Sequence, residues 1–211
     1  MKPADQRGFS LIELMVTLTV FGILLVIGIP TYQQWTLNTR IRTATESIQN
    51  GLRLARNEAS QRGTNVRFYL FANTAGAAEW TVCLLPTSAA SAATVTTCPL
   101  PPAGSSSTLQ SFVNTGDTTN LQVGAATAVA DITGNYSSIM TGGVPGGITF
   151  NALGRPTDYG NTSIIRIDVT AAQAGAQANS RSLVTTISAG GMVNMCDPQI
   201  TFSANSPQGC P

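Results

Sequence analysis

The sequence contains no histidine, and its only lysine is Lys2. Histidine is the usual general base near neutral pH and the commonest metal ligand, so its absence excludes a serine triad and any histidine-bearing zinc site. A Walker-type phosphate lysine, a Schiff-base lysine and a serine–lysine dyad have no candidate in the body of the chain. Arg155, Asp158 and Tyr159 lie close together in the sequence but read as a strand-ending turn. We therefore predict no catalytic residue and no cofactor.

Charge is also scarce. Charged residues make up 10% of the 211 residues, against roughly 25% in an average soluble domain. The formal net charge is +1, so the whole-chain balance gives no reason to expect a polyanionic partner. This length accommodates one ordinary domain together with a short membrane element.

The four cysteines are Cys83, Cys98, Cys196 and Cys210. Four cysteines allow three pairings, and the simplest joins sequence neighbours, Cys83 with Cys98 and Cys196 with Cys210. Each such bridge would stabilise the fold by about 3 kcal/mol in the chain-entropy model. A zinc site built from all four thiolates is the alternative, but the closely spaced C-x-x-C pairs of such sites are missing, so we predict no metal site. Disulfides imply an oxidising compartment.

The longest apolar run lies near the N-terminus. Leu14 to Ile29 is free of charge, and Leu11 and Ile12 extend it close to the roughly 20 residues that cross a bilayer. A cleaved secretory signal would end in a small-residue site, which is missing here, so the helix is expected to stay on the mature protein. Flanking charges leave its orientation ambiguous. The expected disulfides place the body outside the cytoplasm and the short N-terminal segment inside.

One carboxylate, Glu13, stands at the start of this run, where an acid either reaches the headgroups or has a partner in an assembly. The stretch RGFSLIELMVTLTVFGILLVIGIP resembles the class III signal of type IV pilins and type II secretion pseudopilins. The match lies at Gly8, Phe9 and Glu13, and Pro30 falls where many relatives kink the helix. The resemblance implies cleavage between Gly8 and Phe9 by a prepilin peptidase and N-methylation of Phe9. It also implies that Glu13 docks the subunit into a filament by pairing with a neighbour's N-terminal amine.

The rest of the chain predicts a pilin-like α+β fold. Apolar residues spaced by three and four continue to about Arg62, and Gly63 is a plausible helix stop. Short apolar or alternating runs follow, separated by turn-rich pieces, as in antiparallel strands. We expect one long helix, kinked at Pro30, packed on an antiparallel β-sheet domain. The expected parts are a leader (1–8), a hydrophobic helix (9–30), an amphipathic helix (31–63) and a periplasmic β domain (64–211).

Several arginines gather in the amphipathic helix. Six arginines oppose two glutamates between residues 40 and 67, a local net of +4, and Arg42, Arg53 and Arg56 fall within about 60° on one face. These could contact DNA phosphates or a neighbouring subunit. LRLARNEASQRGTNVRFYL, GGITFNALGRP and GGMVNMCDP are similar to the GspH/FimT branch, some of whose members bind DNA. Their G-R-x-R motif is missing before Cys196, where Gly191 to Asn194 read GMVN.

The resemblance therefore implies a minor pilin that helps to start or cap a type IV pilus. The alternatives are a DNA-binding minor pilin in natural transformation and a type II secretion pseudopilin. The expected partners are other pilins, the prepilin peptidase and the inner membrane, with DNA as a further candidate. The expected location is the bacterial inner membrane, with a single pass and a periplasmic body, and then the pilus or pseudopilus.

Overall fold

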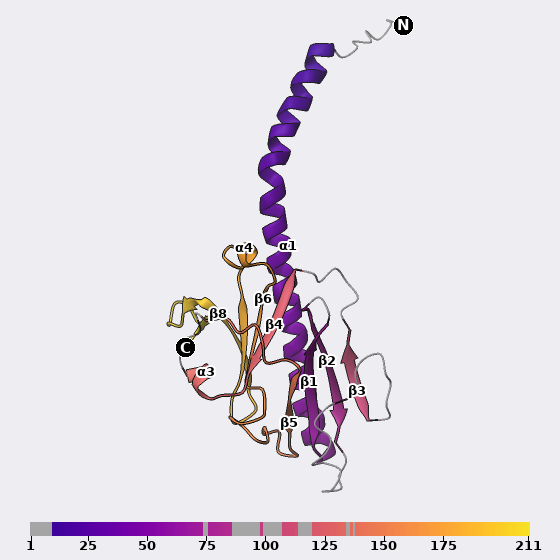
Figure 1. Cartoon of the computed structure of the whole chain (residues 1–211), viewed down its shortest axis with the longest axis vertical. Coiled ribbons are helices and arrows are strands. Elements are labelled where there is room, and N and C mark those ends of the chain that lie inside the picture. The colour runs from indigo at the N-terminus through magenta and orange to yellow at the C-terminus, as the bar shows by residue number, and fades with distance from the viewer. Residues whose placement is uncertain are drawn as a thin grey trace, which may run out of the picture. The chain divides into compact units, whose positions relative to one another are not determined.

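The computed structural model describes residues 10–73, 76–85, 98, 107–113, 120–133, 136 and 138–211. The chain divides into two compact units, the first ending at Thr36 and the second beginning at Leu37. Each unit is described here by itself. One long helix, α1 (Leu11–Arg62), contributes to both (Figure 1).

Helix α1 ends at the predicted stop. Gly63 follows the last helical residue with a φ of 61°, a left-handed conformation that glycine adopts without steric cost. The Thr64 amide donates a 3.3 Å hydrogen bond back to the Ala59 carbonyl, the bond of a Schellman cap. The helical assignment continues through Pro30. The kink expected at that residue stays a prediction.

The body contains two sheets. The first has the strand order β3-β2-β1-β5, with every neighbouring pair antiparallel. Its strands are β1 (Val66–Ala72), β2 (Ala78–Leu84), β3 (Thr108–Phe112) and β5 (Gly146–Phe150). The second sheet has the order β4-β6-β7-β8-β9. Its strands are β4 (Leu121–Ala126), β6 (Arg166–Ala171), β7 (Leu183–Ile187), β8 (Val193–Thr201) and β9 (Gly209–Cys210).

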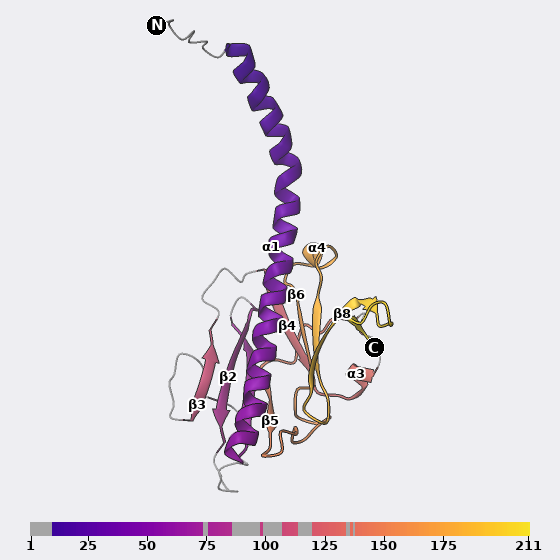
Figure 2. The same ribbon diagram turned by 180° about the vertical axis from the view of Figure 1, so that it is seen from behind.

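The core forms where the body half of α1 meets both sheets, as the view from behind shows (Figure 2). Helix residues at the predicted spacing of three and four are buried there: Ile41, Ile48, Leu52, Ala55 and Ala59. They share one apolar cluster with inward side chains such as Phe68 on β1 and Ile167 on β6. The α+β architecture predicted from the sequence, a long helix packed on antiparallel sheets, is confirmed.

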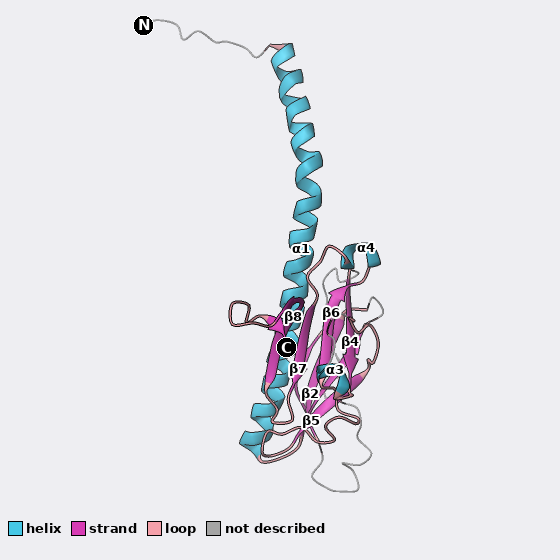
Figure 3. Cartoon of the chain, turned by 90° about the vertical axis from the view of Figure 1, so that its left-hand side faces the viewer, coloured by secondary structure: helices cyan, strands magenta, loops and turns pink. Residues whose placement is uncertain are grey.

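The structure differs from the expectation in small elements. Strand β9 pairs with β8 in parallel, whereas the other strand pairs are antiparallel. Two short helices, α3 (Ala130–Thr133) and α4 (Ala174–Gln177), lie between strands, where the sequence predicts turn-rich pieces. Figure 3 shows both helices beside the second sheet. Elements of two to four residues carry no periodic signal, so sequence patterns miss them.

Two disulfides join sequence neighbours. Cys83 on β2 is bonded to Cys98, and Cys196 on β8 is bonded to Cys210 on β9. The second bridge joins the two strands of the short parallel pair and so cross-links β9 to β8. Most of the stretch between Cys83 and Cys98 lies outside the described residues.

Candidate assembly segment and arginine surface

The N-terminal part of α1 exposes its apolar surface. Every side chain described between Leu11 and Ile29 is exposed, including large ones such as Phe21 and Leu24. By length and composition, α1 could cross a membrane. An apolar surface of this extent marks a site that lipid or protein covers.

Polar groups in this segment are few. The hydroxyls of Thr17 and Thr19 donate to the Leu14 and Val16 carbonyls at 2.9 and 2.8 Å, which removes the cost of placing them in an apolar environment. Glu13 lies in the first turn, where the helix dipole favours an anion. It has no hydrogen-bond or ion-pair partner among the described residues. The predicted cleavage site, Gly8 and Phe9, lies outside them.

The three arginines predicted on one helix face do not form one cluster. The Arg42 Nε donates to Glu46 Oε1 at 2.8 Å, so its charge is locally neutralised. Arg53 lies about 16 Å farther along an ideal helix. There Arg53 and Arg56 line one pocket of about 290 Å³ together with Asn57, Met192 and Val193.

The pocket joins the helix to the turn between β7 and β8. The Arg56 side chain packs against Gly154 and Gly191, where added Cβ atoms would lie 3.3 and 3.4 Å from its Nε. Arg53 contacts the neutral Gln49 Oε1 at 3.5 Å. Neither arginine has a carboxylate partner among the described residues. The pocket therefore offers two positive charges beside an apolar wall that includes the exposed Met192.

The other arginines between residues 62 and 67 are differently placed. Arg62 pairs with Glu58 within the helix. Arg67 is half-buried, donates to Thr149 Oγ1 at 3.0 Å and lies over the Tyr69 ring. Burial lowers the pKa of Arg67 from its usual value. Arg62 and Arg42 are thus paired with glutamates and Arg67 is half-buried on the sheet, whereas Arg53 and Arg56 line the pocket.

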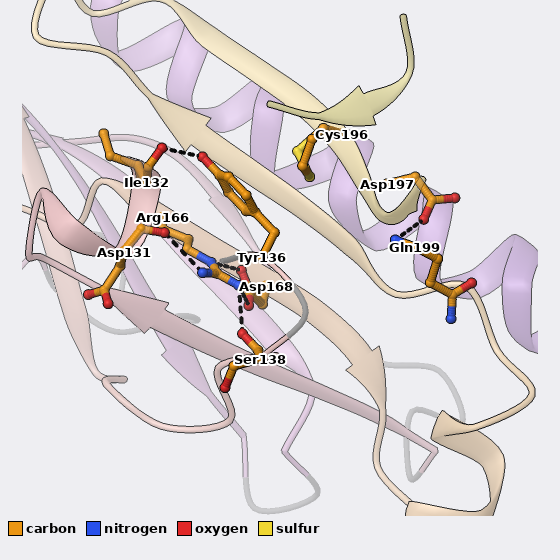
Figure 4. The surroundings of a disulfide bond; sticks show 10 residues. Asp131, Ile132, Tyr136, Ser138, Arg166, Asp168, Cys196, Asp197 and Gln199 are labelled. Carbon is orange, nitrogen blue, oxygen red and sulfur yellow. Dashed lines mark hydrogen bonds and ion pairs between the residues drawn. A yellow bond between two sulfur atoms is a disulfide. The ribbon is translucent and has the colours of Figure 1, made fainter. Parts of the chain in front are cut away.

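A buried charged cluster that the sequence analysis missed lies on the second sheet. Arg166 and Asp168 on β6 point away from α1, because the alternating Ile167 and Val169 belong to the helix-side core. Their side chains are 1% and 0% exposed and are joined by two hydrogen bonds of 2.9 and 2.8 Å (Figure 4). The signal was present in the sequence as a charged pair two residues apart in an apolar strand.

This cluster holds the connection between β4 and β5 against the sheet. The Arg166 guanidinium donates to the backbone carbonyls of Asp131 and Ser138 at 2.9 and 2.8 Å, and it lies 5.0 Å from the Tyr136 ring centre. The Met140 amide donates to Asp168. Burial raises the pKa of Asp168, and the hydrogen bonds from Arg166 oppose that rise. Burial also raises the pKa of Tyr136. These contacts give the cluster a structural role, because they join the β4–β5 connection to β6.

No group of three or more potential metal ligands occurs in the part of the chain that the structure describes. The pocket presents the guanidinium groups of Arg53 and Arg56, and the N-terminal segment presents an apolar surface with one carboxylate, Glu13.

A hydrophobic N-terminal helix that continues into the core of an antiparallel β body is the architecture of the pilin class. Residues 3–29 match the prokaryotic N-terminal methylation motif. Two fimbrial proteins of Pseudomonas aeruginosa are each 38% identical over 61 residues, 29% of this chain and 39% of the relative. The match thus spans about two fifths of the curated relatives' length. No solved structure matches significantly. Together with the fold, these matches support a type IV pilin-like protein.

Proposed function

We propose that this chain is a minor pilin, a structural subunit that takes part in type IV pilus assembly. The observation that carries the proposal is the exposed apolar segment of α1, which overlaps the methylation motif and contains one carboxylate, Glu13, with no partner in the part of the chain that the structure describes. Such a surface needs two successive environments, lipid before assembly and packed helices afterwards. Cleavage between Gly8 and Phe9 by a prepilin peptidase would expose an amine, and Phe9 would be methylated.

Glu13 gives the docking step its specificity. A carboxylate among apolar helices is costly unless a cation pairs with it, and the N-terminal amine of a neighbouring subunit is a cation at the right level of the bundle. The body, clipped by two disulfides, would face the periplasm and contact other pilins. A type II secretion pseudopilin requires the same helix, so the alternative proposal is that this chain is a subunit of a type II secretion system.

The test replaces Glu13 with alanine in the chromosomal copy. We expect Glu13→Ala protein to remain in the inner-membrane fraction but to be lost from sheared filaments. Without the carboxylate, the N-terminal amine of the neighbouring subunit would have no anion to pair with. Glu46→Ala is the matched control: it removes an exposed carboxylate from the same helix, whose pair with Arg42 is worth at most about 0.5 kcal/mol. Recovery of Glu13→Ala in filaments at the control level would refute the docking role.

A deletion strain scored for piliation, protein secretion and DNA uptake distinguishes the machines. A minor pilin predicts loss of pili with normal secretion. A secretion defect with normal pili would overturn the proposal in favour of the pseudopilin.

DNA binding is a second candidate, favoured by the pocket that Arg53 and Arg56 share. These two guanidinium groups, which have no carboxylate partner within the described ranges, could each neutralise a phosphate. The full chain in detergent should then retard duplex DNA, and Arg53→Ala/Arg56→Ala should reduce the salt slope by about 2. Arg42→Ala is the control, because that arginine is already paired. Absence of salt-sensitive retardation at micromolar protein would exclude this function.

A further inference from the structure

Two aromatic side chains follow the apolar part of α1. Tyr32 and Trp35 are 67% and 65% exposed, and their ring centres lie 6.1 Å apart. A spacing of three residues places them on one side of the helix. Both rings are thus mostly exposed, although each is large enough to be a major core component. The pair is therefore an exposed aromatic patch next to an exposed apolar segment.

The distance from this patch to Glu13 matches a bilayer. Along an ideal helix, residue 32 lies about 28 Å from residue 13, and residue 35 about 33 Å from it. The hydrocarbon core of a bilayer is about 30 Å thick. No charged residue occurs between Glu13 and Arg40. When the Glu13 carboxylate is level with one headgroup layer, the two rings are level with the other.

Tyrosine and tryptophan favour this level for a physical reason. Each ring has an apolar body and a polar tip, so both are enriched where hydrocarbon meets water. Gln33 and Gln34 stand between the rings and are also exposed, which suits a headgroup layer better than the hydrocarbon. The polar boundary thus falls beyond Pro30, the residue that the sequence suggested as the end of the hydrophobic helix.

We propose that Tyr32 and Trp35 form an aromatic anchor in the outer headgroup layer of a lipid bilayer, with Glu13 in the inner one. The anchor sets the depth of α1 before the helix enters a filament. This inference rests on the membrane residence proposed above. It adds which residues contact the lipid interface and why Glu13 can be tolerated in the membrane: its carboxylate reaches the inner headgroups.

Tryptophan fluorescence tests the proposal. Trp80 is buried and donates to Ser47, so Trp80→Phe leaves Trp35 as the only tryptophan of the full chain. The protein is reconstituted into phosphatidylcholine–phosphatidylglycerol vesicles whose acyl chains carry bromine either near the headgroup or near the chain end. We expect the headgroup-proximal bromine to quench Trp35 about twofold more strongly than the terminal bromine.

Phe21 provides the matched depth control. It lies in the apolar segment and is exposed, so Phe21→Trp in a chain with Trp35→Phe and Trp80→Phe places one tryptophan near the bilayer centre. The quenching order should then reverse. If Trp80→Phe does not fold, the unmodified chain gives the same comparison, because buried Trp80 in the body adds a constant background.

The possible outcomes distinguish failure of the aromatic-anchor proposal from failure of the proposed membrane location of α1. Flotation of the protein with the vesicles and no quenching of Trp35 by either lipid would overturn the anchor alone. Stronger quenching of Trp35 by the terminal bromine would also overturn it, because the ring would lie in the hydrocarbon. Failure of the chain to float would overturn the membrane residence itself.

Discussion

Replacement of Arg166 should strongly destabilise the body. Its guanidinium is 1% exposed and makes four hydrogen bonds, two to the Asp168 carboxylate and two to backbone carbonyls of the β4–β5 connection. Arg166→Met keeps much of the side-chain length but removes every donor. Asp168, 0% exposed, would keep one hydrogen bond, from the Met140 amide.

The expected loss follows from the buried carboxylate that remains. Breaking a buried ion pair by removing one partner destabilises by about 3 to 5 kcal/mol, a large part of the 5 to 15 kcal/mol typical of a whole domain. At about 2 to 4 °C per kcal/mol for a chain of this size, the melting temperature should fall by about 6 to 20 °C. Arg166→Met/Asp168→Leu should recover most of the loss, because no unpaired charge is then buried.

Urea unfolding of the full chain in detergent micelles, followed by tryptophan fluorescence, measures the effect, because Trp80 is buried in the body and becomes exposed on unfolding. Arg42→Met is the control, since it breaks an arginine–carboxylate pair whose arginine is 70% exposed and should cost at most about 0.5 kcal/mol. A loss for Arg166→Met within about 1 kcal/mol of the control would refute the reasoning. Failure of the double variant to recover would mean that the backbone contacts, and not the ion pair, dominate.

Three further predictions concern pH, a turn and the disulfides. Burial raises the pKa of Asp168, and Arg166→Met removes the opposing hydrogen bonds, so the folded variant binds a proton that the unfolded chain releases. Its stability deficit should therefore shrink as the pH falls from about 7 toward 4, and a pH-independent deficit in urea titrations would contradict this. Gly191 has a φ of 77°, and an added Cβ would clash with the Gly154 carbonyl, so Gly191→Ala should cost more than about 2 kcal/mol. Gly190→Ala, whose Cβ would meet nothing nearer than 3.8 Å, should change thermal unfolding little, and equal losses would count against the argument. Non-reducing mass mapping should find the Cys83–Cys98 and Cys196–Cys210 peptides, whereas a crossed pair would contradict the assignment. Loss of the second bridge should lower stability by about 3 kcal/mol.

Local patterns in the sequence were enough to locate the helix and most strands. The buried positions of α1 follow the spacing of its apolar residues, and its end follows from Gly63. The short apolar or alternating runs predicted after the helix contain strands β1 to β8. Such signals depend on the period of the backbone and on the conformational freedom of glycine, so neighbouring residues suffice to reveal them.

The N-terminal segment could also be predicted from neighbouring residues alone. Glu13, the apolar run and the motif around Phe9 are contiguous, and bilayer thickness sets the length of helix that matters. The sequence by itself therefore determined the class of protein, the long helix and the carboxylate at its start.

Only the tertiary structure decided which charged residues act together. Arg42, Arg53 and Arg56 share a helix face, yet the packing of the β7–β8 turn joins only the last two in a pocket. Likewise, the sequence around Arg166 and Asp168 predicts only a strand. The structure adds that the β4–β5 connection covers both side chains. Burial and pairing depend on contacts between segments that are distant in sequence. The free-energy cost of burying a charged side chain therefore depends on its surroundings in the fold rather than on its neighbours along the chain.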